Sequence, residues 1–137
     1  MNPILRNILA VIAGLVSGNI LIMLIHKVSG SIIPPPDGAD ITTMEGLKSS
    51  MQLFEPKHFL MPFLAHALGT FLGAAVTAYL AASNHFKLAM LIGVFFLVAG
   101  IINVVMLPSP IWFSALDILV AYLPMAYLGG KLTIKNN

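Results

Sequence analysis

Residues 88–107 read LAMLIGVFFLVAGIINVVML, and Asn103 is the one strongly polar side chain in this stretch. An α-helix rises about 1.5 Å per residue, so about 20 apolar residues cross the ~30 Å hydrocarbon core of a bilayer. Lipid offers no hydrogen-bond partner to free backbone N–H and C=O groups, and a lone segment satisfies them only as a helix. The stretch therefore predicts a transmembrane helix.

Three more apolar stretches of similar length occur, at residues 4–25, 59–82 and 111–129. The chain has 137 residues, of which 58% are hydrophobic and only 9% are charged; a soluble domain has about 25% charged residues. We predict an all-α polytopic membrane protein, a single transmembrane domain over residues 1–137 with four helices in a compact bundle. A cleaved signal peptide is the rival interpretation of the first stretch, but its apolar part exceeds the ~7–15 residues of a signal sequence.

The connections differ in length. Pro108-Ser109-Pro110 and Ser83-Asn84-His85 predict tight turns, whereas residues 27–58 form one long loop. In this loop Thr42 and Glu45 fit a helix-capping box. Apolar residues then recur at helical spacing up to Pro56, at Met44, Leu47, Met51 and Phe54. This pattern predicts a short amphipathic helix, lying either in the membrane interface or over the end of the bundle.

Basic residues set the expected orientation. One side of the membrane receives Arg6, Lys87, Lys131 and Lys135 with no acidic residue, and the other receives three lysines together with four acidic residues. Because Lys and Arg are retained in the cytoplasm, we expect both termini there and the long loop outside, in a bacterial cytoplasmic (inner) membrane.

Small residues predict where the first two helices meet. Gly14 and Gly18 form one GxxxG pattern and Gly69 and Gly73 another. This spacing allows two backbones to approach closely in lipid, where the hydrophobic effect does not drive helix association. The aromatic residues of the last stretch are expected to be interfacial anchors, namely Trp112, Phe113, Tyr122 and Tyr127.

Four polar residues lie inside the predicted spans, at similar depth near the long-loop side: Asn19, His66, Asn103 and Asp117. Ionisable groups are costly in a membrane and usually face the bundle interior with a partner. We expect His66 and Asp117 to be such partners. Two interpretations stay open, since the cluster can be structural interhelical hydrogen bonding or a site for a proton or a solute.

Patterns of known chemistry are absent from the sequence. It has no HExxH, GxSxG or Gly-rich phosphate loop, and no cysteine. The four histidines lack metal-ligand spacing. With a net charge of +2 from so few charges, nucleic acid is not an expected partner. We therefore predict no catalytic, cofactor-binding or metal-binding residues.

Several local sequences resemble a family of small uncharacterised bacterial four-helix membrane proteins, over nearly the whole chain. They are Pro34-Pro35-Pro36-Asp37, Ala65-His66-Ala67-Leu68-Gly69-Thr70, the segment from Asn103 through Pro108-Ser109-Pro110-Ile111-Trp112-Phe113, and Leu128-Gly129-Gly130-Lys131-Leu132. The resemblance implies the fold and no particular activity, substrate or cofactor.

The sequence thus favours a non-enzymatic integral membrane protein, working as an oligomer or as a subunit beside another membrane protein. The alternative is a proton-linked transporter of a small solute or lipid, built around the polar layer. A dry layer indicates packing, and a wet cavity that reaches a bulk phase indicates transport.

Overall fold

The computed structural model describes residues 1–135; residues 136–137, the end of the predicted domain, lie outside the described part. Within residues 1–135 the chain is helical and has no strand. The helices follow in the order α1 (Pro3–Ile32), α2 (Met44–Ser50), η1 (Met51–Leu53), η2 (Pro56–Phe59), α3 (Leu60–Leu80), α4 (His85–Met106), α5 (Ile111–Val120) and α6 (Leu123–Lys135).

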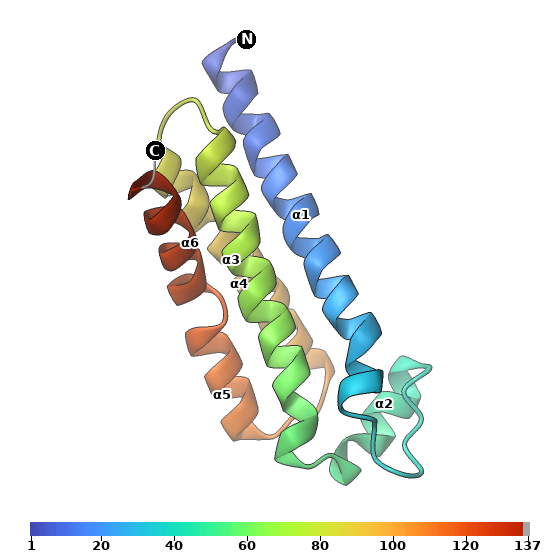
Figure 1. The fold of residues 1–137 in the computed structure, drawn as a ribbon. Helices are drawn as coiled ribbons and strands as arrows, with labels where there is room; N and C mark the ends of the chain where they lie inside the picture. Colours follow the sequence, from blue (N-terminus) through green and yellow to red (C-terminus); the bar gives the residue numbers. More distant parts are fainter. Residues whose placement is uncertain (136–137) are drawn as a thin grey trace.

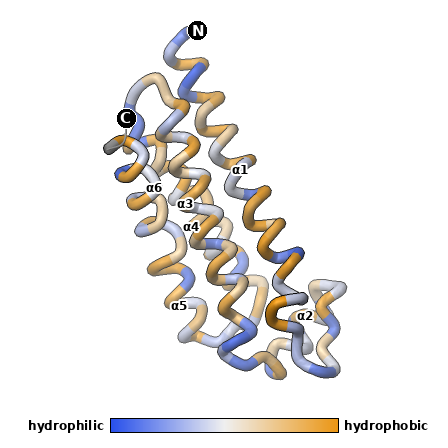
Figure 2. The backbone as a smooth tube through the Cα atoms, in the orientation of Figure 1, coloured by the Kyte–Doolittle hydropathy of each residue, from blue (hydrophilic) through white to orange (hydrophobic). Residues whose placement is uncertain are grey.

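The long helices run side by side as a bundle. Both termini lie at one end, and α2 with the long loop lies at the other (Figure 1). Four segments are long and apolar enough to cross a membrane: Pro3–Ile32, Pro56–Leu80, His85–Met106 and Ile111–Ile134. Hydrophobic residues cover the helices along most of their length (Figure 2). The chain is therefore a helical-bundle membrane protein.

Helix α1 is longer than the predicted span 4–25. Asn2 caps its start, because its side chain accepts a hydrogen bond from the N–H of Ile4 (2.8 Å). The helix continues to Ile32 and ends before Pro34, since proline disfavours helical backbone in the residue before it. Its 30 residues give a length of about 45 Å, so α1 exceeds the hydrocarbon core and brings residues 26–32 to the loop end as helix.

Helix α3 is the centre of the bundle and contacts α1, α4 and α6. It meets α1 at the two pairs of glycines. A Cβ added to Gly18 would lie 2.7 Å from the carbonyl oxygen of Gly69, and one added to Gly73 would lie 2.7 Å from that of Gly14. These helices touch backbone to backbone, which any larger side chain would prevent.

The end that carries the termini is held by hydrogen bonds between distant parts of the sequence. Asn7 on α1 accepts from the N–H of Ala82 (2.8 Å), just after α3, and its amide donates to Ser83 Oγ (3.1 Å). Arg6 Nε donates to the carbonyl oxygen of Leu80 (2.8 Å). These bonds fix the start of α1 against the turn between α3 and α4.

A short helix does occupy the long loop, but its cap differs from the prediction. Thr43, not Thr42, is the N-cap, and its Oγ1 accepts from the N–H of Gly46 (2.9 Å). Thr42 instead donates twice to Asp40. The threonine beside the first helical residue is the one that reaches the free N–H groups of the first turn, so the cap moves by one residue.

The apolar side of this segment packs on the bundle. Met51 forms a buried cluster with Phe59 and Phe113, and Leu47 and Phe54 pack against it. Of these residues only Leu47 belongs to α2, so the amphipathic helix, and its place in the membrane interface or over the bundle end, stay predictions.

The fourth span is broken. Helices α5 and α6 are separated by a turn at Ala121 and Tyr122, two residues before Pro124. Proline has no N–H to donate to the carbonyl of Val120, and its ring would clash with that carbonyl in a continuous helix. The break thus follows directly from the sequence, although the prediction for residues 111–129 is one unbroken helix.

Candidate functional site

His66 and Asp117 meet in the interior of the bundle. His66 comes from the first turns of α3, and Asp117 from the middle of α5. His66 Nδ1 lies 3.0 Å from Asp117 Oδ1 and 3.1 Å from Oδ2. The His66 side chain is 15% exposed and the Asp117 side chain 5% exposed. The carboxylate accepts at both oxygens, so Nδ1 carries a proton and Nε2 is the free nitrogen of the ring.

Two further residues complete the cluster. Tyr122, at the break between α5 and α6, donates from its hydroxyl to Asp117 Oδ2 (2.8 Å). Its ring stacks on the ring of His66, with centroids 5.9 Å apart. On the other side, the ring of His26 on α1 meets His66 edge to face at 5.7 Å. His66 therefore lies between His26 and Tyr122, and Asp117 joins it to the broken helix.

The sequence reasoning missed both added residues. Tyr122 was expected to be an interfacial anchor, but it is only 2% exposed and lies in the core. Pro124 was the signal that could have placed it, because the turn before this proline directs Tyr122 inward. His26 lies one residue beyond the predicted first span, and the extension of α1 brings it to the cluster.

The other residues predicted to be interfacial anchors lie in two different environments. Trp112 and Tyr127 are exposed on the outside of the bundle. Phe113 is buried against Phe59, with ring centroids 4.7 Å apart, so it belongs to the apolar cluster at the loop end.

The two asparagines do not bond to the pair. Asn19 is exposed, and its amide donates to the carbonyl oxygen of Leu15 (2.9 Å) on its own helix. Depth along a helix does not fix rotation about its axis, so Asn19 shares the layer and faces away from it. Asn103 on α4 lines the same cavity as His66 and Asp117.

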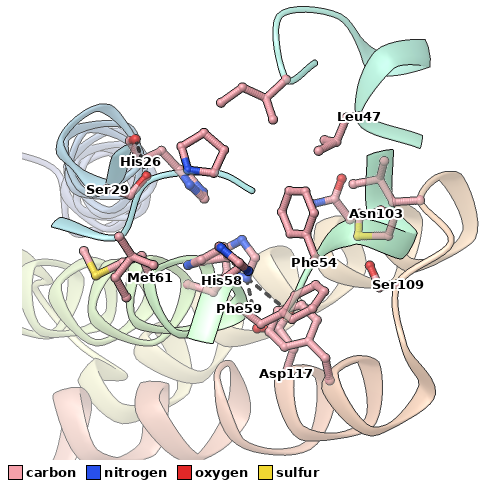
Figure 3. Close-up of a pocket in the computed structure, with 18 of the residues that line it drawn as sticks. His26, Ser29, Leu47, Phe54, His58, Phe59, Met61, Asn103, Ser109 and Asp117 are labelled. Atoms are coloured by element: carbon pink, nitrogen blue, oxygen red, sulfur yellow. Dashed lines mark hydrogen bonds and ion pairs between the residues drawn. The ribbon is translucent and has the colours of Figure 1, made fainter. Parts of the chain in front are cut away.

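A cavity of about 590 Å³, here called the loop-end cavity, opens beside the pair. The ends of α1 and α4, the starts of α3 and α5, and the loop with α2 surround it. In Figure 3, His26, Leu47 and Asp117 approach it from different elements. Its wall is largely apolar, with Leu47, Met51, Phe54, Phe59, Val104 and Leu107 among the lining residues.

The chemistry of the site is that of hydrogen bonding and charge. Within residues 1–135 no group of three or more His, Asp and Glu side chains is placed to hold a metal ion. The cluster offers a carboxylate that already has two donors and imidazole rings that face an apolar space. Pockets of roughly 300–1,000 Å³ with apolar walls and a few convergent polar groups bind small molecules in many proteins.

Fold and site together define a helical-bundle membrane protein with an ionisable pair beside a partly open cavity at the loop end. Comparison of the chain with protein-family models, with curated proteins and with solved structures returns no match. The site is therefore interpreted from its own geometry.

Proposed function

We propose that this protein is a small non-enzymatic membrane protein that binds an amphipathic small molecule in the loop-end cavity. The carrying observation is that the His66–Asp117 pair borders a cavity of about 590 Å³. A pair that served packing alone would be expected in a dry, filled layer. An apolar wall with polar groups at one place suits a molecule that has an apolar body and one polar end.

The setting we propose is the cytoplasmic membrane of a bacterium, with both termini inside. The basic residues at the end of the bundle that carries the termini support this orientation. Helix α1 packs chiefly on α3 and keeps an exposed apolar ridge, formed by Ile8, Ile12, Val16 and Ile20. We place this ridge against lipid, a second copy of the chain or a neighbouring membrane protein.

A second candidate function is proton-linked transport of the bound molecule, as a small solute or lipid. One observation favours it: the helix break at Ala121 and Tyr122 lies beside Asp117. Transporters commonly build their sites from discontinuous helices, since a break lets the two halves move and frees backbone groups at the site. An Asp–His pair can also gain or lose a proton when a ligand arrives.

Photolabelling tests the binding function. A long-chain alcohol that carries a diazirine and has no charge is cross-linked to the protein in phosphatidylcholine nanodiscs, and labelled residues are mapped by mass spectrometry. We expect label on cavity residues such as Met51 and Phe54. The variant Val104→Trp should lose this label, because the larger side chain fills the cavity. The matched control is Val105→Trp, because Val105 is 82% exposed and does not line the cavity.

Label confined to lipid-facing positions such as Leu9 and Leu119, and equal in wild type and both variants, would contradict ligand binding in the cavity. Binding should also raise the unfolding temperature of the wild type, because a ligand that binds only the folded state stabilises it.

A further inference from the structure

Basic and acidic residue types are unequally represented around the loop-end cavity. Four basic side chains line it, on α1, η2 and α3: His26, Lys27, His58 and His66. Among residues 1–135, Asp117 is the one acidic side chain in the lining. The acidic residues of the loop lie outside the lining, although four of them stand against three lysines on that side of the bundle.

Asp117 has little left to offer a ligand. Its oxygens already accept from His66 Nδ1 and from the Tyr122 hydroxyl. A cationic ligand would have to break one of these bonds to reach the carboxylate. Leaving a buried partner without its bond costs free energy, so the arrangement disfavours a cation.

The basic side chains, in contrast, keep nitrogen atoms for a ligand. His66 uses Nδ1–H for Asp117, which leaves Nε2; this nitrogen is an acceptor on the neutral ring and becomes a donor when the ring takes up a second proton. His58 Nδ1 accepts from the N–H of Glu55 (2.8 Å), so the proton of the neutral ring is on Nε2. Lys27 contributes an ammonium group from the end of α1. An anion is the ligand that these donors can satisfy together.

Helix dipoles do not alter this preference for an anion. Helices α1 and α4 end at this side of the bundle, whereas α3 and α5 begin there. Two negative and two positive helix ends therefore face the same region, and their effects oppose each other. The side chains decide which charge is preferred.

We propose that the ligand is a single-chain amphiphile with an anionic head group, a carboxylate or a phosphate. The head group lies among His26, Lys27 and His66, and the chain lies along the apolar wall. This inference rests on the proposed binding function and adds the chemical class of the ligand. A free acid and an anionic lipid of the bilayer share this chemistry.

Competition against the neutral photolabel tests the head group. The competitors have one chain length and differ in charge: dodecanoate and dodecyl phosphate, dodecanol, and dodecyltrimethylammonium. We expect the two anions to displace the label from Met51 and Phe54 at about tenfold lower concentration than dodecanol, since hydrogen bonds to a charged group are worth at least that factor. The ammonium compound should be the weakest.

The double variant His26→Gln/His66→Gln should reduce the preference for anions to about threefold or less, because glutamine keeps polarity and removes the ring nitrogens that can take up a proton. The matched control is Lys87→Gln, which removes a positive charge from the exposed start of α4, outside the cavity lining. It should leave the preference unchanged.

The outcomes separate the two proposals. If dodecanol or the ammonium compound displaces the label as well as dodecanoate does, the anionic head group is wrong and the binding function stands. If no competitor protects the cavity residues, the binding function itself is wrong. Nanodiscs with phosphatidylglycerol identify the source of the anionic ligand. Loss of label without added acid indicates a lipid of the bilayer, and retained label indicates a free amphiphile. Either result supports the anionic head group when dodecanoate is preferred over dodecanol.

Discussion

Gly100 on α4 lies directly against the ring of Tyr122, so closely that a Cβ on Gly100 would be 2.5 Å from the tyrosine hydroxyl oxygen. The glycine leaves the space in which Tyr122 turns inward at the helix break. From there its hydroxyl reaches Asp117 (2.8 Å). The missing side chain on one helix thus positions a donor on another, and this donor holds the carboxylate beside His66.

Tyr122→Phe should lower the free energy of unfolding by about 1–3 kcal/mol, because Asp117 Oδ2 loses the buried hydrogen bond from the tyrosine hydroxyl. Gly100→Ala should also destabilise the protein, because the ring must move to make room. Unfolding in detergent measures both. The control is Tyr127→Phe, since Tyr127 is exposed and its hydroxyl only accepts from Lys131. Equal losses for Tyr122→Phe and Tyr127→Phe would contradict the role of the buried hydroxyl.

The packing of α1 on α3 gives a second prediction. Gly14→Ala should cost about 1–3 kcal/mol, because the new Cβ would lie 2.5 Å from the carbonyl oxygen of Gly73 and also clash with the Thr77 hydroxyl. The matched control is Gly30→Ala in the same helix, where a Cβ meets nothing within 4 Å. It should be neutral or stabilise by up to about 1 kcal/mol, the usual helical advantage of alanine. Indistinguishable melting temperatures would show that Gly14 marks no close contact.

Much of this architecture could be predicted because the bilayer constrains it. Apolar length predicts the four spans, and the spacing of Gly14, Gly18, Gly69 and Gly73 predicts a close crossing at a place where the two backbones do meet. Depth counting also placed His66 and Asp117 at one level, and they lie 3.0 Å apart.

What the sequence did not predict depends on rotation and on helix ends. Asn19 does not face the polar pair, because its amide bonds to Leu15 on its own helix. Counting residues along a helix predicts depth in the membrane and contains no information on rotation about the helix axis. His26 was missed because a span ends where hydrophobicity ends, whereas α1 continues through Lys27 in helical conformation. The cavity itself arises from the fold of the long loop over the bundle end, which no local pattern encodes.

The loop gives a prediction on pH. The hydroxyl of Thr42 (2.6 Å), and then its N–H (3.0 Å), donate to Asp40 Oδ1 and hold the pKa of this carboxyl below its ordinary value. A lowered pKa in the folded state adds stability that is present above the ordinary pKa, about 3.9, and is lost as pH falls through the folded value. Hydrogen exchange of the Thr42 amide should therefore stay protected from pH 7 to pH 5 and lose protection below about pH 4.

Thr42→Val removes the hydrogen bond from the Thr42 hydroxyl, which lowers the pKa of Asp40 more than the bond from the N–H does. The loss of protection should therefore begin at higher pH. A transition at the same pH in both proteins would contradict the part assigned to the Thr42 hydroxyl.

Orientation in the membrane can be tested with single cysteines, since the chain has none. Ser50 is a poor position, because it is buried and accepts from the N–H of Asp40. Gln52 in the loop and Ser83 at the opposite end are both exposed. In intact cells an impermeant maleimide should label Gln52→Cys and leave Ser83→Cys unlabelled until the membrane is opened. The reverse pattern would show that the termini lie outside.

The last prediction concerns Asp117 and separates binding from transport. Asp117→Leu should lower the free energy of unfolding more than Asp117→Asn, because leucine leaves His66 and Tyr122 without a buried partner, at about 1–3 kcal/mol each. Asparagine can still accept from the Tyr122 hydroxyl and bond to His66. It cannot ionise, however, and it removes the acidic group that residues 1–135 contribute to the cavity lining. If the protein only binds an anionic amphiphile, Asp117→Asn should bind dodecanoate at least as well as the wild type, since a negative charge near the head group is gone.

If the protein moves its ligand together with a proton, uptake of dodecanoate into proteoliposomes driven by a pH gradient should be present in the wild type and absent in Asp117→Asn, with binding intact. Weaker binding in Asp117→Asn, in a variant that unfolds at the wild-type temperature, would contradict the view that Asp117 positions His66 and does not itself hold the ligand.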